Sequence, residues 1–199
     1  MATGTGAVWR TAAVRPGDRV AVFGCGGVGL SAVMGAAAIG ASTVIAVDVA
    51  TDKLAVAEQL GATASIRWTG GPEETASLVH EATGGVDAAF EATGRPDVAR
   101  AAFLSTRARG AAVLIGIPPA DSEVSFPALS IPRLERRVLG SIYGSTMPER
   151  DFPEILARYG RGELPIERLI SHRFPLDGIG EAFELLRRGD TLRAVVTME

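Results

Sequence analysis

The chain has 199 residues, a formal net charge of −3 at pH 7 and 47% hydrophobic residues. Such a chain can bury one substantial core, which excludes a disordered protein. No basic cluster stands apart from the acidic residues, so neither nucleic acid nor an anionic membrane is an expected partner. The N-terminus lacks a basic stretch followed by an apolar run, and Cys25 is the only cysteine. We therefore expect a cytoplasmic protein without a secretory signal or an internal disulfide.

The first predicted elements are a short helix over Thr5–Val14 and, after a turn, a strand over Arg19–Phe23. This strand is apolar after its first residue, as is typical of strands buried in parallel sheets. A segment rich in Ala, Leu and Met follows with helical spacing, and Thr43–Val47 predicts a second strand. No charged residue separates the start of the first strand from Asp48, but the glycines in this stretch favour two covered strands and a helix over a membrane span.

A glycine-rich run joins the first strand to the helix, and its residues are Gly24, Cys25, Gly26, Gly27, Val28 and Gly29. In this pattern the first glycine permits a tight turn, the second lets the backbone approach a pyrophosphate, and the third lets the helix pack on the strand. Asp48 follows Gly29 by 19 residues and ends the second strand. Its carboxylate can bind the ribose hydroxyls of an adenosine and repel a 2′-phosphate. The pattern predicts a dinucleotide site that prefers NAD to NADP, and the alternative is a domain of this fold whose loop binds nothing.

Lys53 is the only lysine of the chain. It lies five residues after Asp48, at the start of a helix predicted over Thr51–Leu60. From there an ammonium group can reach the same ribose, and an ordinary surface charge is the alternative.

The middle of the chain continues to alternate strands with helices. Strands are predicted over Thr63–Ile66, Val86–Glu91 and Gly110–Gly116, and helices over Pro72–Ala82 and from Arg95 onward. This alternation predicts an α/β fold, a Rossmann doubly wound parallel sheet with right-handed crossovers and helices on both faces. The loops that leave the strand ends are expected to line one crevice.

The pattern changes after Ser122. Further strands are predicted over Val124–Phe126, Val138–Tyr143 and Leu192–Thr197, and helices over Ala128–Arg136, Phe152–Tyr159 and Ile179–Arg188. The tail from Tyr143 carries too little apolar surface to form its own core, so we expect it to dock on something else.

Several motifs follow one another in an order that is specific to one family. They are the Gly24–Gly29 loop with Asp48 and Lys53, then Gly84-Gly85-Val86-Asp87, Phe90-Glu91-Ala92-Thr93-Gly94-Arg95, Ile115-Gly116-Ile117-Pro118-Pro119, Gly140-Ser141-Ile142-Tyr143-Gly144 and the ending around Leu192-Arg193-Ala194. Together they closely resemble the zinc-dependent alcohol dehydrogenases of the medium-chain dehydrogenase/reductase superfamily. The resemblance implies an NAD-binding Rossmann domain over residues 1–142. It also implies that residues 143–199 are a C-terminal remnant that would complete a catalytic domain.

The resemblance also assigns roles to residues. It implies that Gly24–Gly29 and Arg193 hold the pyrophosphate, and that Asp48 and Lys53 hold the adenosine ribose. The nicotinamide would lie between two further groups, Ile115, Gly116 and Ile117, and Ser141, Ile142 and Tyr143. Segments 122–126 and 138–141 resemble the edge through which family members dimerise, so a homo-oligomer is expected.

The family's N-terminal half, with its catalytic zinc ligands, proton relay and four-cysteine zinc lobe, has no counterpart in this chain. Cys25, His80 and His172 are the only Cys or His residues, and they share no ligand spacing, so we expect no zinc site here. The intact family enzyme uses zinc and transfers a hydride between a small alcohol or aldehyde and NAD. This chain is expected to be the inactive NAD-binding portion, and the alternative is a standalone NAD-binding or partner module without catalysis. A short-chain dehydrogenase is disfavoured because neither Tyr143 nor Tyr159 precedes a lysine by four residues.

Overall fold

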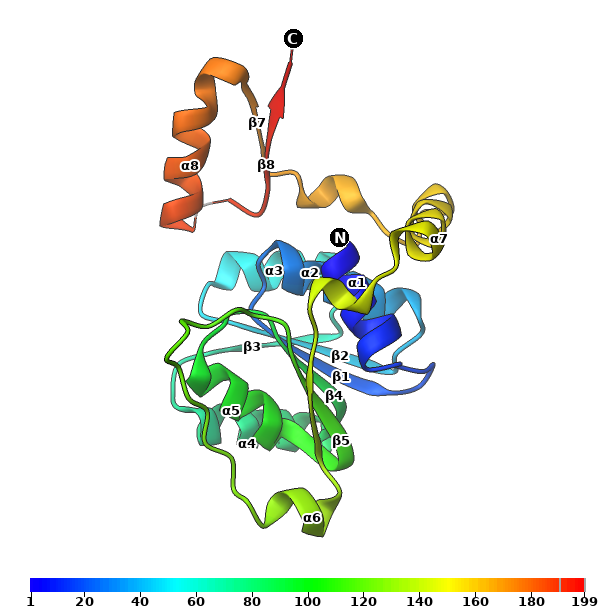
Figure 1. Ribbon diagram of the computed structural model, residues 1–199, viewed down its shortest axis with the longest axis vertical. Helices are drawn as coiled ribbons and strands as arrows, with labels where there is room; N and C mark the ends of the chain where they lie inside the picture. The colour runs from blue at the N-terminus through cyan, green and yellow to red at the C-terminus, as the bar shows by residue number, and fades with distance from the viewer. Residues whose placement is uncertain (190, 199) are drawn as a thin grey trace.

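The computed structural model describes residues 1–189 and 191–198. Their main sheet is parallel throughout and has the strand order β3-β2-β1-β4-β5-β6. Its strands are β1 (Arg19–Phe23), β2 (Thr43–Asp48), β3 (Ala64–Arg67), β4 (Val86–Glu91), β5 (Thr106–Leu114) and β6 (Arg137–Gly140). The helices that accompany it are α1 (Ala2–Gly6), α2 (Gly27–Ala38), α3 (Thr51–Gln59), α4 (Pro72–Thr83) and α5 (Pro96–Ser105), and they cover both faces of the sheet (Figure 1). The predicted Rossmann fold is confirmed.

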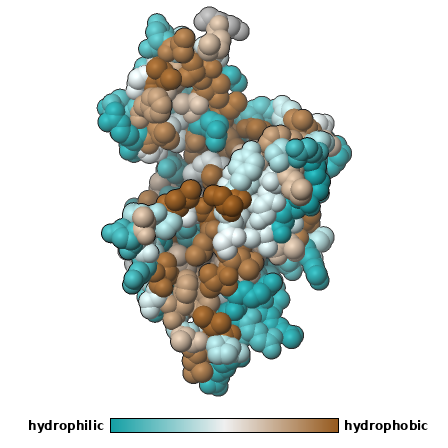
Figure 2. Space-filling view, in the orientation of Figure 1, coloured by the Kyte–Doolittle hydropathy of each residue, from teal (hydrophilic) through white to brown (hydrophobic). Residues whose placement is uncertain are grey.

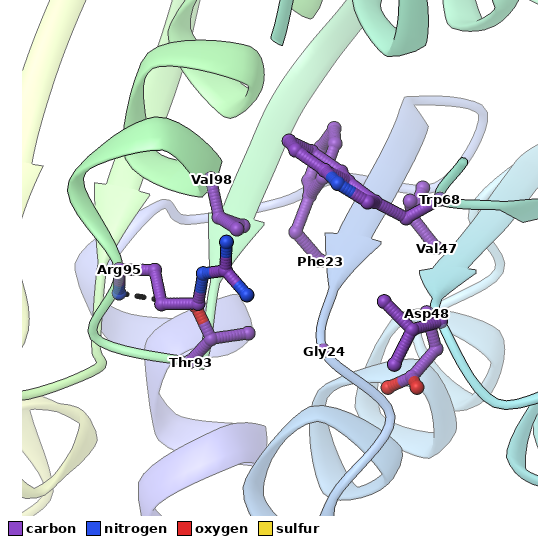
Figure 3. A pocket seen from close by; sticks show the side chains of 9 residues that line it. Phe23, Gly24, Val47, Asp48, Trp68, Thr93, Arg95 and Val98 are labelled. Atoms are coloured by element: carbon purple, nitrogen blue, oxygen red, sulfur yellow. Dashed lines mark hydrogen bonds between the residues drawn. The ribbon is translucent and has the colours of Figure 1, made fainter. Parts of the chain in front are cut away.

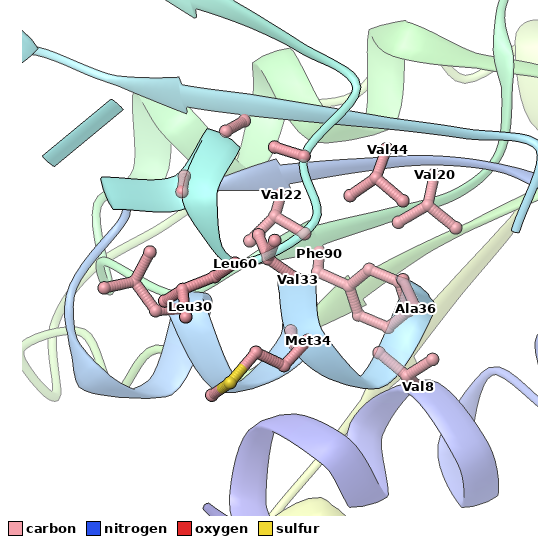
Figure 4. Packing of buried hydrophobic residues seen from close by; sticks show 14 of the residues in the cluster. Val8, Val20, Val22, Leu30, Val33, Met34, Ala36, Val44, Leu60 and Phe90 are labelled. Carbon is pink, nitrogen blue, oxygen red and sulfur yellow. The ribbon is translucent and has the colours of Figure 1, made fainter. Parts of the chain in front are cut away.

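The core consists of two apolar clusters, one on each face of the sheet. Alternate residues of β1 point to opposite faces, because the side-chain period of a strand is two. Val20 and Val22 therefore pack with Phe90 under α2 (Figure 4), whereas Ala21 and Phe23 pack against α4 and α5. Both faces are covered, which explains why the strands are apolar without alternation.

The N-terminal helix is an integral part of this packing. It runs as α1 and continues as a π-helical turn, η1 (Ala7–Thr11), so it starts and ends earlier than the predicted Thr5–Val14. The Trp9 indole N–H donates to the Gly35 carbonyl at 2.9 Å. A Cβ on Gly4 would lie 2.3 Å from the Val28 carbonyl oxygen, so the two helices approach at a distance that only glycine permits.

The segment after β5 differs most from the prediction. Val124–Phe126 is not a strand, because β6 pairs with β5 in its place, with Val138 opposite Ala112. The Phe126 ring packs instead on Phe103 of α5, at 4.6 Å between centroids. The helix predicted over residues 128–136 is short, α6 (Ser130–Leu134), and the left-handed φ of 49° at Glu135 follows it. Strand β6 stops at Gly140 and gives way to a 3-10 turn, η2 (Tyr143–Ser145), where Tyr143 has a left-handed φ of 53°.

The last part of the chain divides its packing between the main core and a small outlying unit. Helix α7 (Pro148–Gly160) contributes Ile155 to the cluster under α2, and the 3-10 turn η3 (Ile166–Leu169) contributes Leu169. Leu164, between the two elements, belongs to the same cluster. The outlying unit consists of β7 (His172–Pro175), the turn η4 (Leu176–Gly178), α8 (Ile179–Arg188) and β8 (Ala194–Thr197), and it projects from the main body (Figure 1). The sequence did not predict β7, and β8 is shorter than the predicted Leu192–Thr197.

Strands β7 and β8 form a two-stranded parallel sheet. Parallel sheets normally have both faces covered, yet apolar side chains gather on the surface of this unit (Figure 2). Ile179, Phe183 and Leu186 of α8 are among the exposed large apolar residues. No helix of the described residues is both long and apolar enough to cross a membrane.

A buried carboxylate ties α7 to the N-terminal helix. Asp151 is almost fully buried, and its oxygens accept hydrogen bonds from the Met147 amide at 2.7 Å and from the guanidinium of Arg10 at 2.9 Å. Arg150 binds the same carboxylate through two N–H groups, at 2.7 and 2.9 Å. The Arg150 hydrogen bonds above all, opposed by burial and aided by Met147 and Arg10, hold the pKa of Asp151 well below its usual range.

Replacing Asp151 by asparagine should lower the free energy of unfolding at pH 7 by about 2–3 kcal/mol, because a charged acceptor is lost. A lowered folded-state pKa stabilises the protein above the ordinary value of 3.8 and does so less as the pH falls below it. The difference between wild type and variant should therefore narrow below about pH 4. Urea denaturation of both proteins at several pH values measures this difference in unfolding free energy. Glu184→Gln, which removes an exposed ion pair with Arg187, is the control and should change stability by less than about 0.5 kcal/mol.

Candidate functional site

The candidate site lies where the carboxyl ends of the central strands meet. Strands β1 and β4 are neighbours, and the chain winds away from them in opposite directions, since β2 and β3 lie on one side and β5 and β6 on the other. In open α/β sheets, ligands bind outside the carboxyl ends of the strands at this switch point. The loops after β1, β2, β4 and β5 all emerge at this edge, as the sequence analysis expected.

The glycine loop has the geometry that its glycines predict. Gly24 has a φ of 94° and donates its amide to the Val47 carbonyl at 2.8 Å, which makes the tight turn after β1. A Cβ on Gly29 would lie 1.7 Å from the Gly24 carbonyl oxygen, so only glycine lets α2 pack so closely on the loop. Within the part of the chain that the structure describes, a Cβ on Gly26 would meet no heavy atom within 4 Å. The Gly26 backbone thus borders open space at the N-terminus of α2, where free N–H groups favour an anion.

Asp48 is anchored to this loop. Its carboxylate accepts the Cys25 amide at 2.6 Å and the Ala50 amide at 2.9 Å. Burial and then the Asp48 charge raise the pKa of the Cys25 thiol to about 12. Cys25 is therefore a neutral, buried thiol whose contribution to the site is its backbone N–H.

A cavity of about 140 Å³ opens beside Asp48. Its lining comes from the ends of several strands and the loops that follow them, and includes Phe23, Gly24, Val47, Asp48, Val49, Trp68, Thr93, Arg95 and Val98 (Figure 3). The walls are mostly apolar or aromatic side chains, with the Asp48 carboxylate on one side and the Arg95 guanidinium on the other. A flat heteroaromatic base attached to a ribose fits this combination.

Trp68, Thr93 and Arg95 have no role predicted from the sequence. Trp68 directly follows β3, and Thr93 and Arg95 lie in the loop after β4, so position after a strand end was the signal for all three. The buried Glu91 carboxylate shapes the loop after β4, because it accepts hydrogen bonds from the amides of Thr93 and Gly94 at 2.5 and 2.8 Å. Asp97 in turn holds the Arg95 guanidinium, at 3.1 and 2.7 Å.

The resemblance assigned two basic residues to the cofactor, Lys53 and Arg193. Arg193 lies in the loop between α8 and β8, and Lys53 lies next to this loop. A guanidinium nitrogen of Arg193 is 3.6 Å from the position of a Cβ on Gly27, in the first turn of α2. The Lys53 ammonium is 3.8 Å from the position of a Cβ on Gly189, just after α8. Arg193 is thus brought to the anion-binding end of α2, and Lys53 faces the outlying unit. The roles of both residues stay predictions.

The residues assigned to the nicotinamide gather at the ends of β5 and β6. Ile115 and Ser141 are buried, whereas Ile117, Ile142 and Tyr143 are exposed by 80%, 76% and 51%. The Ser141 amide donates to the Leu114 carbonyl at 2.9 Å, which joins the two strand ends. A Cβ on Gly116 would lie 2.0 Å from the Gly94 amide nitrogen, so the loops after β4 and β5 touch. Their roles toward a nicotinamide also stay predictions.

The Cys and His residues do not assemble into a metal centre. His80 Nε2 lies 2.9 Å from the Leu104 carbonyl, and His172 Nδ1 lies 3.1 Å from the Ser171 hydroxyl. Within residues 1–189 and 191–198, no three His, Cys, Asp or Glu side chains group closely enough to hold a metal ion. The residues described therefore do not fit a zinc site.

Comparison with known proteins identifies the family. A sequence profile described as zinc-binding dehydrogenase matches residues 27–160. This chain belongs to the zinc-binding dehydrogenase family. The resemblance to zinc-dependent alcohol dehydrogenases inferred from the motifs is thereby confirmed.

Solved structures match almost the whole chain. An alcohol dehydrogenase zinc-binding domain protein from Burkholderia ambifaria is 34% identical with a TM-score of 0.94, and the match covers 99% of this chain and 53% of that one. Benzyl alcohol dehydrogenase from Acinetobacter calcoaceticus is 31% identical, also with a TM-score of 0.94, over 99% of this chain and 54% of that one. A zinc-binding dehydrogenase from Sinorhizobium meliloti, described as putative and bound to NADP, is 27% identical with a TM-score of 0.78, over 91% and 52%. The chain spans about half the length of these dehydrogenases.

The open space at Gly26 yields a direct test of the site in this dehydrogenase chain. Gly26→Val should leave the melting temperature nearly unchanged, because a Cβ at this position meets no heavy atom of the described residues within 4 Å. It should abolish measurable dinucleotide binding, because it occupies the space next to the α2 N-terminus. Calorimetric titration and thermal melting of the same samples measure both. Gly29→Ala is the matched variant, and it should lower the melting temperature in addition to weakening dinucleotide binding. A Gly26→Val variant that still binds the dinucleotide would contradict the site.

Proposed function

We propose that this chain is the NAD-binding part of a zinc-type alcohol dehydrogenase. In the complete enzyme, hydride would pass between an alcohol or aldehyde and NAD. The observation that carries the proposal is the Asp48 carboxylate, which is fixed by the Cys25 amide beside the open N-terminus of α2. Family membership supports the reaction class, and the relatives named as alcohol dehydrogenases support the substrate class.

The geometry offers one path for the cofactor. The pyrophosphate would bind the free amides at the N-terminus of α2, within the Gly24–Gly29 run, and the Arg193 guanidinium, which supplies a compensating charge. The adenosine would place its ribose on Asp48 and its base in the neighbouring cavity. Because two mononucleotide-binding halves meet at the switch point, the nicotinamide would extend over the ends of β5 and β6. Bound NAD would supply hydride transfer, and the protein supplies position and electrostatics.

NAD is favoured over NADP by charge. A 2′-phosphate on the adenosine ribose would approach the Asp48 carboxylate, which two backbone amides hold in place. The repulsion would be strong in a partly buried crevice. The relative from Sinorhizobium meliloti was solved with NADP bound, so the cofactor preference of this chain has to be tested directly.

Calorimetric titration of the purified chain should show NAD binding more tightly than NADP. Asp48→Gly should reduce that preference by about 1–3 kcal/mol, because the ribose hydroxyls lose a charged acceptor. Glu58→Gln, on the exposed side of α3, is a control that keeps the preference. Equal or tighter binding of NADP by the wild-type chain would contradict the assignment.

Catalytic zinc needs three protein ligands, and the described residues do not supply such a group. We therefore expect the purified chain to hold no stoichiometric zinc and to produce no NADH from alcohols. Elemental analysis and a turnover assay check this. Bound zinc with alcohol-dependent NADH formation would contradict it. NAD binding without turnover agrees both with part of a larger enzyme and with a standalone NAD-binding module. Family membership favours the first.

We further infer a cytoplasmic homo-oligomer, from the single cysteine and from the outer edge of β6. Strand β6 pairs with β5 on one side only, and an unpaired edge is a template for another strand. Val138 on β6 and the nearby Leu129 and Ile131 are exposed apolar side chains. A second copy can cover this edge about a twofold axis. A species that sediments as a monomer at all concentrations would contradict it.

A further inference from the structure

Three hydroxyl groups join the end of the N-terminal helix to the turn after β6. Thr11 Oγ1 lies 2.8 Å from Ser141 Oγ and 2.8 Å from Ser145 Oγ. A hydroxyl has one proton to donate and lone pairs to accept, so Thr11 can pair with both serines at once. The serines lie 130 and 134 residues further along the chain. The Thr11 hydroxyl is therefore a tertiary clamp on the two ends of segment 141–145.

The segment that Thr11 clamps has a strained backbone. Tyr143, Gly144 and Ser145 are consecutive left-handed residues, with φ of 53°, 70° and 52°. Tyrosine and serine rarely adopt this conformation, and such strain persists only where the surroundings impose it. The Gly144 backbone packs on the N-terminal helix, since a Cβ there would lie 2.5 Å from the Thr3 carbonyl oxygen. The helix and the Thr11 hydroxyl together impose the shape of this turn.

The helix side of the clamp is also irregular. Residues Ala7–Thr11 form a π-helical turn, in which the Ala12 amide donates to the Ala7 carbonyl at 2.9 Å. Turns of this kind are rare, and they occur frequently at functional sites. The wider turn carries Thr11 to the two serines at the end of the helix.

The clamped segment follows the carboxyl end of β6, at the same edge of the sheet as the glycine loop. The Ser141 amide is used by the Leu114 carbonyl. Within residues 1–189 and 191–198, the amides of Ile142 and Tyr143 have no hydrogen-bond acceptor. Both residues are exposed at the end of β6, on the half of the switch point opposite Asp48. Two oriented amides are suited to the carboxamide oxygen of a nicotinamide, whereas the adenosine half of the cofactor does not extend to them.

We propose that Thr11 is a positioning residue for the nicotinamide half of the dinucleotide. Its hydroxyl holds segment 141–145 so that the Ile142 and Tyr143 amides face the crevice before the cofactor arrives. The inference rests on the proposed function, because it presupposes dinucleotide binding at the switch point. It adds a role for a residue whose side-chain hydrogen bonds go to Ser141 and Ser145.

The test compares NADH with ADP-ribose, which shares everything but the nicotinamide, on the full chain. Thr11→Val keeps the branched shape and removes the hydroxyl. It should weaken NADH binding about 3- to 10-fold, as expected for lost neutral hydrogen bonds, and leave ADP-ribose affinity unchanged. The shift of NADH emission on binding should shrink in this variant. Thr11→Ser restores the hydroxyl and should bind both ligands as wild type does, and Ser145→Ala, which breaks one arm of the clamp at an exposed residue, should show a smaller selective loss.

The outcomes separate this proposal from the one on which it rests. Equal weakening of NADH and ADP-ribose by Thr11→Val would mean a purely structural residue and would overturn the proposal. Unchanged NADH affinity and emission would overturn it as well. A wild-type chain that binds neither ligand would overturn the proposed function, and this inference with it.

Discussion

Helix α2 can begin after only a short turn beyond β1 because Gly29 has no side chain. Its α-carbon lies against the carbonyl of Gly24, and any Cβ would overlap that oxygen. This one contact sets the angle between strand and helix, and so places the free amides of the α2 N-terminus at the edge of the sheet. The Cys25 amide in the same turn then fixes the Asp48 carboxylate, although 23 residues separate the two. The anion-binding end and the acid therefore keep a constant separation.

Contacts between distant parts of the chain build the other half of the crevice. The N-terminal helix lies between α2 and the turn after β6, and glycines at both contacts allow backbone to approach backbone. Its Trp9 is bound to Gly35 on one side, and its Arg10 reaches the buried Asp151 of α7 on another. These interactions fix the N-terminal helix between α2, α7 and the turn after β6. The position of segment 141–145 relative to the glycine loop depends on it.

The outlying unit of α8, β7 and β8 has a different balance of forces. It has a two-stranded parallel sheet and an amphipathic helix whose apolar residues are exposed, so little of its stability comes from burial. It nevertheless brings Arg193 to the first turn of α2 and the α8–β8 loop to Lys53. In a family whose solved members are about twice as long, this unit has apolar surface available for further protein.

Local sequence determined the central fold. Short stretches of the sequence each predict one local structure: apolar strands around Val22 and Ile45, a tight turn at the glycine loop and an acid at the strand end in Asp48. The parallel sheet agrees with all of these, so element order, fold class and the glycine turn were predictable. Tertiary structure alone decided which segments pair and which side chains converge. Val124–Phe126 has strand-like residues, but β6 takes the place beside β5, and Phe126 packs on Phe103 of α5 instead. Three features depend on residues that are far apart in the chain. They are the left-handed conformation of Tyr143, the cavity between Trp68 and Arg95, and the hydrogen bond between Thr11 and Ser141. Periodicity reports only on neighbours along the sequence, and these features arise from contacts that form when the sheet and its helices have packed.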